Sequence, residues 1–177
     1  TRALAESGAV VALCPSTEAN LGDGLFPLHD YLESNGHMAI GSDSHISINP
    51  FEELRWLEYG QRLATRTRNV ASLRDSHVGS ELFLRALEGG DIATGQSTVG
   101  LQAGAPADLV ALSGDDPMLA GHSDASRIDA LVFSGYPLPI ERVMVNGEWC
   151  VRDGMHVRRD EARDAYATAI AGLGVSE

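Results

Sequence analysis

Two short apolar runs, each leading directly into polar residues, constrain the fold of this chain more than any other feature. The runs are AVVAL at 9–13 and HMAI at 37–40, and a helical pattern precedes each, at 1–7 and 25–34. Alternation of this kind favours parallel strands joined by crossover helices. We therefore expect an α/β fold, with polar residues gathered where the strands end.

The pattern changes in the second half of the chain. Pro50 is well placed to open a helix, and residues 77–88 predict another that ends at Gly89-Gly90. Further on, Asn146-Gly147 is a strong hairpin signal. The remaining predicted elements are strands at 107–112, 128–133, 142–145 and 148–152 and a last helix at 160–171. We divide the chain accordingly into 1–94, 95–158 and 159–177.

Composition excludes several classes of function. The chain has a formal net charge of -12, and all 13 of its Lys-or-Arg residues are Arg. A chain this acidic has no general reason to bind nucleic acid or an anionic membrane surface. Cys14 and Cys150 form no CxxC pair, and we interpret both as buried thiols in strand-like runs. No apolar run approaches the roughly 18 residues of a membrane span. No signal peptide is visible, and we expect a cytoplasmic location.

Asp43 is the strongest candidate for chemistry. It follows the second apolar run in the segment GSDSH, just after a glycine that leaves space around it. A carboxylate at a strand end can bind a metal and accept a proton from water that the metal activates. A loop aspartate that caps backbone N–H groups explains the same position. His45 is next best placed, although a loop histidine is more often solvated than catalytic.

The other polar residues give weaker signals. No two of the six histidines are two, three or four residues apart, so neighbouring residues cannot assemble a three-histidine zinc site. Segment 16–24, predicted as a loop, contains Glu18 and Asn20. It could close over a polar substrate, or form a tight turn whose side chains satisfy the backbone. Arginines at 55–68 could attract a carboxylate substrate, although a solvated helix face is the simpler interpretation.

These motifs resemble a known group of enzymes. The strand ending in GSDSH resembles the last barrel strand of the amidohydrolase superfamily. AGAPADLVAL (103–112) and RVMVNGEWCVRDG (142–154) resemble strands of its accessory β-sandwich. More specific are CPSTEANLGDG (14–24), GSDSHISINPFEELRWLEYGQRL (41–63) and the Arg-rich continuation to Asn69. Together they resemble the formimidoylglutamate deiminase family over essentially the whole chain.

The resemblance implies the C-terminal part of a (β/α)8 barrel, with its last two strands and outer helices, followed by part of the β-sandwich. It implies one divalent metal, usually zinc, and hydrolytic deamination of N-formimino-L-glutamate to N-formyl-L-glutamate and ammonia in histidine degradation. Asp43 would bind the metal, accept a proton from the attacking water and pass it to the leaving amine. Ser44, His45, Glu18 and Asn20 are candidate substrate-binding residues. Most relatives are dimers, so a homo-oligomer is also implied.

The chain departs from the family pattern in one large respect. The HxH pair of the first barrel strand and the ligands of the middle strands are absent, and a complete barrel needs roughly 250 residues. We therefore expect a fragment whose activity belongs to a longer parent, with no catalysis by the 177 residues alone. Two alternatives remain open. One is a deaminase acting on a guanine-like or triazine-like ring, and the other is an inert module whose exposed strand edges pair with another copy.

Overall fold

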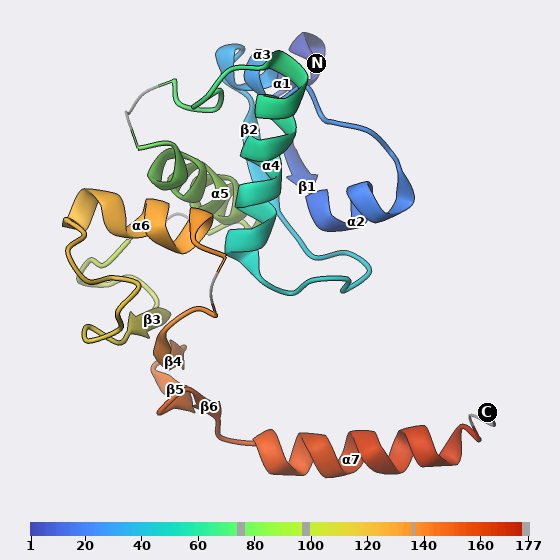
Figure 1. Cartoon of the computed structure of the whole chain (residues 1–177), viewed down its shortest axis with the longest axis vertical. Helices are drawn as coiled ribbons and strands as arrows, with labels where there is room; N and C mark the ends of the chain where they lie inside the picture. The colour runs from blue at the N-terminus through green and yellow to red at the C-terminus, as the bar shows by residue number, and fades with distance from the viewer. Residues whose placement is uncertain (74–76, 97–99, 136, 175–177) are drawn as a thin grey trace. The chain divides into compact units, whose positions relative to one another are not determined.

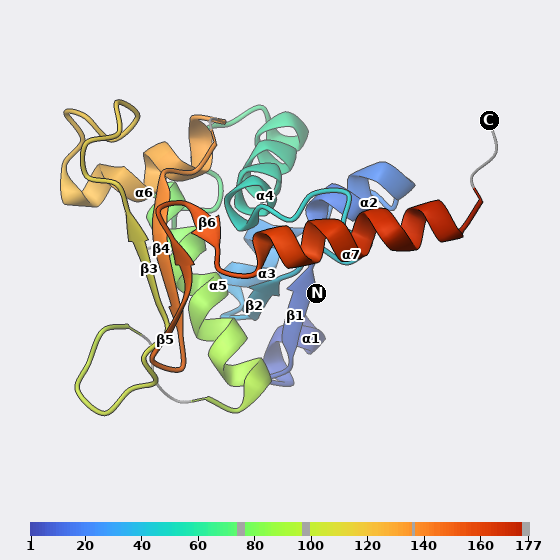
Figure 2. The same ribbon diagram turned by 90° about the horizontal axis from the view of Figure 1, so that it is seen from below.

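The computed structural model of this mixed α/β chain divides into two compact units, shown in Figures 1 and 2. Unit 1 comprises Thr1–Gln102 and Pro117–Tyr136, and unit 2 comprises Ala103–Asp116 and Pro137–Glu177. Within these spans the structure describes every residue except those at 74–76, 97–99, 136 and 175–177.

Unit 1 is built on two parallel strands. β1 (Val10–Leu13) and β2 (His37–Ile40) pair in register along their whole length, which confirms the predicted parallel arrangement. α1 (Arg2–Glu6) precedes β1, and the crossover between the strands contains α2 (Pro15–Leu21) and α3 (Leu28–Glu33). Both strands therefore point their carboxyl ends toward the same edge of the sheet.

The prediction of a loop at 16–24 is wrong over most of that segment, because α2 begins directly after β1. Pro15 occupies the first helical position, where its missing N–H costs nothing. The Glu18 carboxylate then accepts a hydrogen bond from the Cys14 N–H at 2.8 Å. Gly22, with φ 77°, ends the helix in the left-handed conformation.

Two long helices cover the strands. α4 (Pro50–Thr65) starts as predicted, and the Asn49 side chain accepts a hydrogen bond from the Phe51 N–H at 3.0 Å. α5 (Val78–Thr94) packs along β2, as Figure 2 shows, and does not stop at Gly89-Gly90. A Cβ at Gly89 would lie 1.9 Å from the Met38 carbonyl oxygen. Gly89 therefore allows α5 to lie close to β2. The prediction that the helix ends at Gly89-Gly90 did not consider this contact.

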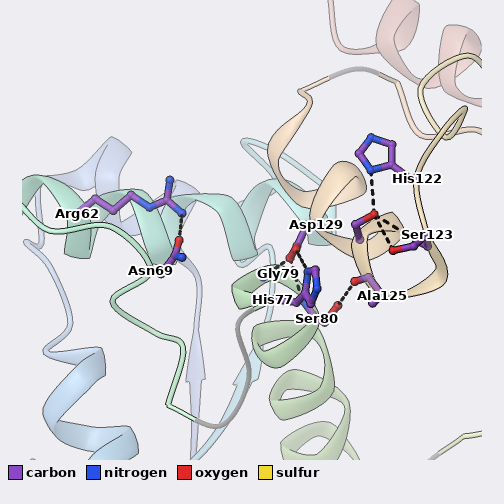
Figure 3. Close-up of polar contacts among 10 residues, drawn as sticks. Arg62, Asn69, His77, Gly79, Ser80, His122, Ser123, Ala125 and Asp129 are labelled. Atoms are coloured by element: carbon purple, nitrogen blue, oxygen red, sulfur yellow. Dashed lines mark hydrogen bonds and ion pairs between the residues drawn. The ribbon is translucent and has the colours of Figure 1, made fainter.

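The predicted strand at 128–133 is also wrong, because these residues belong to α6 (Asp124–Phe133). A short apolar run does not by itself distinguish a strand from a buried helix segment. Here Val132 is fully buried in the core of unit 1. Asp129 fixes α6 to α5: its carboxylate accepts from the Gly79 N–H at 2.7 Å and lies 2.6 Å from His77 Nδ1, as Figure 3 shows.

One of the predicted surface arginines has a structural role. Arg62 Nε donates to Oε1 of Glu58 at 2.7 Å, and the Glu58 side chain is fully buried. The same carboxylate accepts the N–H groups of Val70 and Ala71, both at 3.0 Å, so it fixes the loop that follows α4. The Arg62 guanidinium also lies over the Phe133 ring, 5.0 Å from its centroid. Arg62 is thus bound within unit 1.

Unit 2 is a small antiparallel sheet in the order β3-β4-β5-β6, followed by a helix. The predicted turn at Asn146-Gly147 is confirmed, since both residues have positive φ, 49° and 82°. No helix in the described part of the chain is long and apolar enough to cross a membrane. The elements of unit 2 are β3 (Leu109–Leu112), β4 (Ile140–Val145), β5 (Glu148–Arg152), β6 (Met155–His156) and α7 (Arg159–Gly172).

Candidate metal-binding site

The segments that leave β1 and β2 meet at the carboxyl edge of the sheet. The Gly41 N–H donates to the Leu13 carbonyl at 3.0 Å, which extends the strand pairing by one residue. A Cβ at Gly41 would lie 3.3 Å from Cys14 Sγ. The residues after β2 therefore pass directly over the start of α2. This brings segments 14–18 and 41–45 together, although they are far apart in sequence.

Asp43 lies in the turn that follows β2, with its side chain exposed. Its φ of 50° is in the left-handed region, which Asp and Asn adopt more readily than most other residues. The turn is closed by a hydrogen bond from the His45 N–H to the Ser42 carbonyl at 3.2 Å. His45 is left-handed too, with φ 57°. Two unfavourable backbone conformations so close together require support from the surrounding structure.

Thr17 provides that support. Its side chain is 1% exposed, and its hydroxyl donates to the Ser42 carbonyl at 2.9 Å. The same oxygen lies 3.3 Å from the Ser44 backbone N and 3.0 Å from the Ser44 hydroxyl. Thr17 thus holds the residue before Asp43 and the residue after it. Nothing in the sequence identified Thr17, because its partners lie on a different strand–loop segment.

A buried carboxylate anchors the start of α2 in turn. Glu53, on α4, is 2% exposed and accepts hydrogen bonds from the Ser16 N–H at 2.8 Å and the Ser16 hydroxyl at 2.5 Å. A buried carboxyl group with a hydrogen bond at each oxygen fixes the groups around it. The sequence did not identify this pair, because Glu53 lies in a segment that showed only helical periodicity and Ser16 lies in the segment predicted as a loop.

The four predicted substrate-binding residues occupy different environments. Ser44 and His45 share the turn of Asp43, and His45 Nδ1 lies 3.3 Å from the Ser42 hydroxyl. Glu18 directs its carboxylate to the Cys14 N–H, while Asn20 lies on the exposed surface of α2. The structure therefore places two of these residues directly beside Asp43 and two on the neighbouring helix.

The carboxyl edge is electrostatically negative. Burial raises the pKa of the Cys14 thiol, and the charges of Asp43, Glu18 and Glu53 raise it further, which places three carboxylates around this thiol. Cys14 itself is only partly buried, so the sequence interpretation of a buried thiol is correct only in part. An accumulation of negative charge at the end of parallel strands suits a cation.

Asp43 fits one position of a divalent metal site. Its exposed oxygen ligands suit zinc, which also takes nitrogen and sulfur donors. Among the described residues, the one group of three candidate ligands whose donor atoms lie within 4.8 Å of one another is His29, Asp30 and Glu33, on α3. That group does not include Asp43. Within the described ranges, no such group of three includes a residue at the carboxyl edge.

Comparisons with known proteins show which family this chain resembles in sequence. The amidohydrolase family model matches residues 1–150. Formimidoylglutamate deiminase of Pseudomonas aeruginosa is 46% identical over 172 residues, which are 97% of this chain and 38% of that protein. The 5-methylthioadenosine/S-adenosylhomocysteine deaminase of Pyrococcus furiosus is 29% identical, over 96% of this chain and 40% of that protein. The chain thus spans about two fifths of the length of these curated relatives.

Solved structures give the same result. A crystal structure of an amidohydrolase from Brucella melitensis aligns with a TM-score of 0.90 and 40% identity, over 97% of this chain and 38% of that one. An atrazine chlorohydrolase from Arthrobacter aurescens, complexed with zinc and atraton, aligns with a TM-score of 0.76 and 25% identity, over 94% of this chain and 36% of that one. With a family match over most of its length and the strand-end aspartate in place, the chain belongs to the amidohydrolase family.

Proposed function

We propose that this chain supplies the metal-binding aspartate of a zinc-dependent formimidoylglutamate deiminase. One observation carries the proposal: Asp43 lies at the carboxyl end of β2 in a chain that is 46% identical, over 97% of its length, to a protein of that name. The zinc in the related atrazine chlorohydrolase supports the choice of metal. Because the chain spans 38% of the Pseudomonas relative, the activity is proposed for a polypeptide that also carries the other ligands.

The proposed reaction is a hydrolytic deamination. Water adds to the formimino carbon of N-formimino-L-glutamate, the bond from that carbon to its terminal nitrogen breaks, and ammonia and N-formyl-L-glutamate are released. Asp43 accepts a proton from the attacking water and passes it to the departing nitrogen, so the carboxylate ends in its starting state. Bound zinc would polarise the water and lower its pKa. Ser44 and His45, in the same turn, are proposed to contact the substrate, with Glu18 and Asn20 as further candidates from α2.

A second candidate function is deamination of a ring substrate. It is favoured by the 29% identity to the Pyrococcus furiosus 5-methylthioadenosine/S-adenosylhomocysteine deaminase. The higher identity of the Pseudomonas relative, 46%, favours the formimino substrate. Both candidates use Asp43 in the same way and differ in what the surrounding side chains bind.

A hybrid enzyme tests the proposal. The matching 172-residue segment of the Pseudomonas aeruginosa relative is replaced by this chain, and ammonia release is measured with N-formimino-L-glutamate and with 5-methylthioadenosine. We expect turnover of the formimino substrate, and its loss by at least about 10³-fold in Asp43→Asn, as for removal of an essential proton-transfer group. Asp115→Asn, a change at an exposed aspartate of unit 2, is the control. Turnover of a ring substrate instead, or full activity of Asp43→Asn, would refute the proposal.

A further inference from the structure

We infer that Thr17 is a positioning residue that holds the turn of Asp43 in its left-handed conformation and so sets where the Asp43 carboxylate stands. The effect of Thr17 on catalysis rests on the proposed function. The effect of Thr17 on the turn rests on its hydrogen bonds to Ser42 and Ser44.

The Thr17 hydroxyl contacts the residue before Asp43 and the residue after it. Its single proton goes to the Ser42 carbonyl at 2.9 Å. The Ser44 hydroxyl, 3.0 Å away, must then be the donor toward Thr17, as is the Ser44 N–H at 3.3 Å. One oxygen therefore donates to the residue before Asp43 and accepts from the residue after it. The peptide groups on both sides of Asp43 are thus tied to one buried atom.

The turn needs such a restraint because of its backbone. Asp43 has φ 50° and His45 has φ 57°, so two side-chain-bearing residues adopt the left-handed region within one turn. Without the restraint, the turn can relax to conformations in which the Asp43 side chain points elsewhere. A carboxylate that binds a metal and moves a proton has to stand within a fraction of an ångström of its working position.

Thr17 is itself held rigidly, which makes it suitable for this role. It is 1% exposed and follows Ser16, whose N–H and hydroxyl both bind the buried Glu53 carboxylate of α4. A path of hydrogen bonds therefore runs from α4, through the first turn of α2, to the loop after β2. Partners that orient metal ligands in this indirect way change metal affinity or activity by about 10–100-fold when removed.

The structural part of the inference is tested on the full 177-residue chain without metal. Thr17→Val keeps the shape of the side chain and removes the hydroxyl, and Thr17→Ser keeps the hydroxyl. We expect amide hydrogen exchange at Ser44 to be several-fold faster in Thr17→Val and near the parent rate in Thr17→Ser. Thr65→Val is the matched control, because the Thr65 hydroxyl binds only the Gln61 carbonyl of its own helix, at 2.9 Å. Unchanged exchange at Ser44 in Thr17→Val would overturn the inference.

The catalytic part is tested in the hybrid enzyme. We expect Thr17→Val to lower kcat about 10–100-fold and to weaken zinc binding, measured by competition with a chelator, while KM changes little. Thr17→Ser should restore both. A general loss of folding would instead reduce the active fraction with kcat per bound zinc unchanged, and that result contradicts the inference. If Thr17→Val does not fold, Ser44→Ala, a change at an exposed residue, removes one of the three contacts and should weaken zinc binding by a smaller factor. Zinc affinity is the measurement here because a proposed substrate contact of Ser44 does not affect it, and an unchanged zinc affinity would count against the inference.

If the unsubstituted hybrid enzyme does not turn over the formimino substrate, the proposed function fails by itself. The exchange measurement at Ser44 still decides whether Thr17 holds the turn, so the two failures are distinguishable.

Discussion

At the scale of single residues, the candidate site depends on groups that work through their neighbours. Asp43 carries the proposed chemistry, but Thr17 and Glu53 determine where it stands. The close approach of β1 and β2 also brings Asp43 near Cys14, so the thiol reports on the charge at the site. A sequence pattern identifies Asp43 because strand-end carboxylates are recognisable. It cannot identify Thr17 or Glu53, whose partners are set by tertiary contacts.

The ionisation of Cys14 is predicted to depend on Asp43. Burial and then the Asp43 charge raise the pKa of this thiol. In a metal-free Cys150→Ser chain, the rate of alkylation by iodoacetamide should therefore rise with pH around a midpoint above the usual value of about 8.5. Asp43→Asn removes one negative charge and should lower the midpoint. An identical midpoint in the two chains would show that Asp43 does not lie near Cys14.

At the scale of elements, much of the fold follows from local pattern. The start of α4 at Pro50 and the turn at Asn146-Gly147 were predicted correctly, since each depends on neighbouring residues. The parallel strands were predicted correctly from the alternation of strands with helices along the chain. The prediction of a loop at 16–24 was wrong, because a proline can open a helix as well as end a strand. The prediction of a strand at 128–133 was wrong, because a short apolar run is compatible with a strand or a buried helix. The prediction that a helix ends at Gly89 was wrong, because this glycine lies inside α5 and allows close contact with β2.

Two glycines in α5 provide a matched test of that contact. Gly89→Ala would place a methyl group 1.9 Å from the Met38 carbonyl oxygen, so it should lower the free energy of unfolding by about 3 kcal/mol, the upper end of overpacking costs. Gly90→Ala meets no atom within 4 Å and should raise it by about 0.5–1 kcal/mol. Urea unfolding measures both. Equal effects of the two substitutions would contradict the packing of α5 on β2.

At the scale of the whole molecule, each of the two units is built from two separate stretches of the chain. The chain leaves unit 1 after Gln102, contributes Ala103–Asp116 to unit 2, and returns as Pro117–Tyr136 with α6. This return could not be predicted from the sequence, because the interpretation of 128–133 as a strand assigned these residues to a sheet. α6 completes the core of unit 1 through Val132 and caps α5 through Asp129.

The contacts of Asp129 on α6 with His77 and Gly79 should contribute to the free energy of unfolding. Asp129→Ala removes the acceptor for the Gly79 N–H and one partner of His77, and should lower the free energy of unfolding by about 1–2 kcal/mol. Asp124→Ala, in the same helix, removes only an ion pair with Arg127 in which the Asp124 side chain is 95% exposed, and should change it by less than about 0.5 kcal/mol. Thermal unfolding of both variants measures the two changes. A larger loss of stability in Asp124→Ala than in Asp129→Ala would show that the contacts of Asp129 do not stabilise unit 1.

Whether Asp43 binds the metal is decided by the distance from its carboxylate to the zinc. A crystal structure of the zinc-loaded hybrid enzyme provides it. We expect one Asp43 carboxylate oxygen at about 2.0–2.2 Å from the zinc, a normal zinc–oxygen ligand distance. A zinc ion coordinated entirely by other residues, with the Asp43 carboxylate outside its ligand shell, would refute a metal-binding role for Asp43.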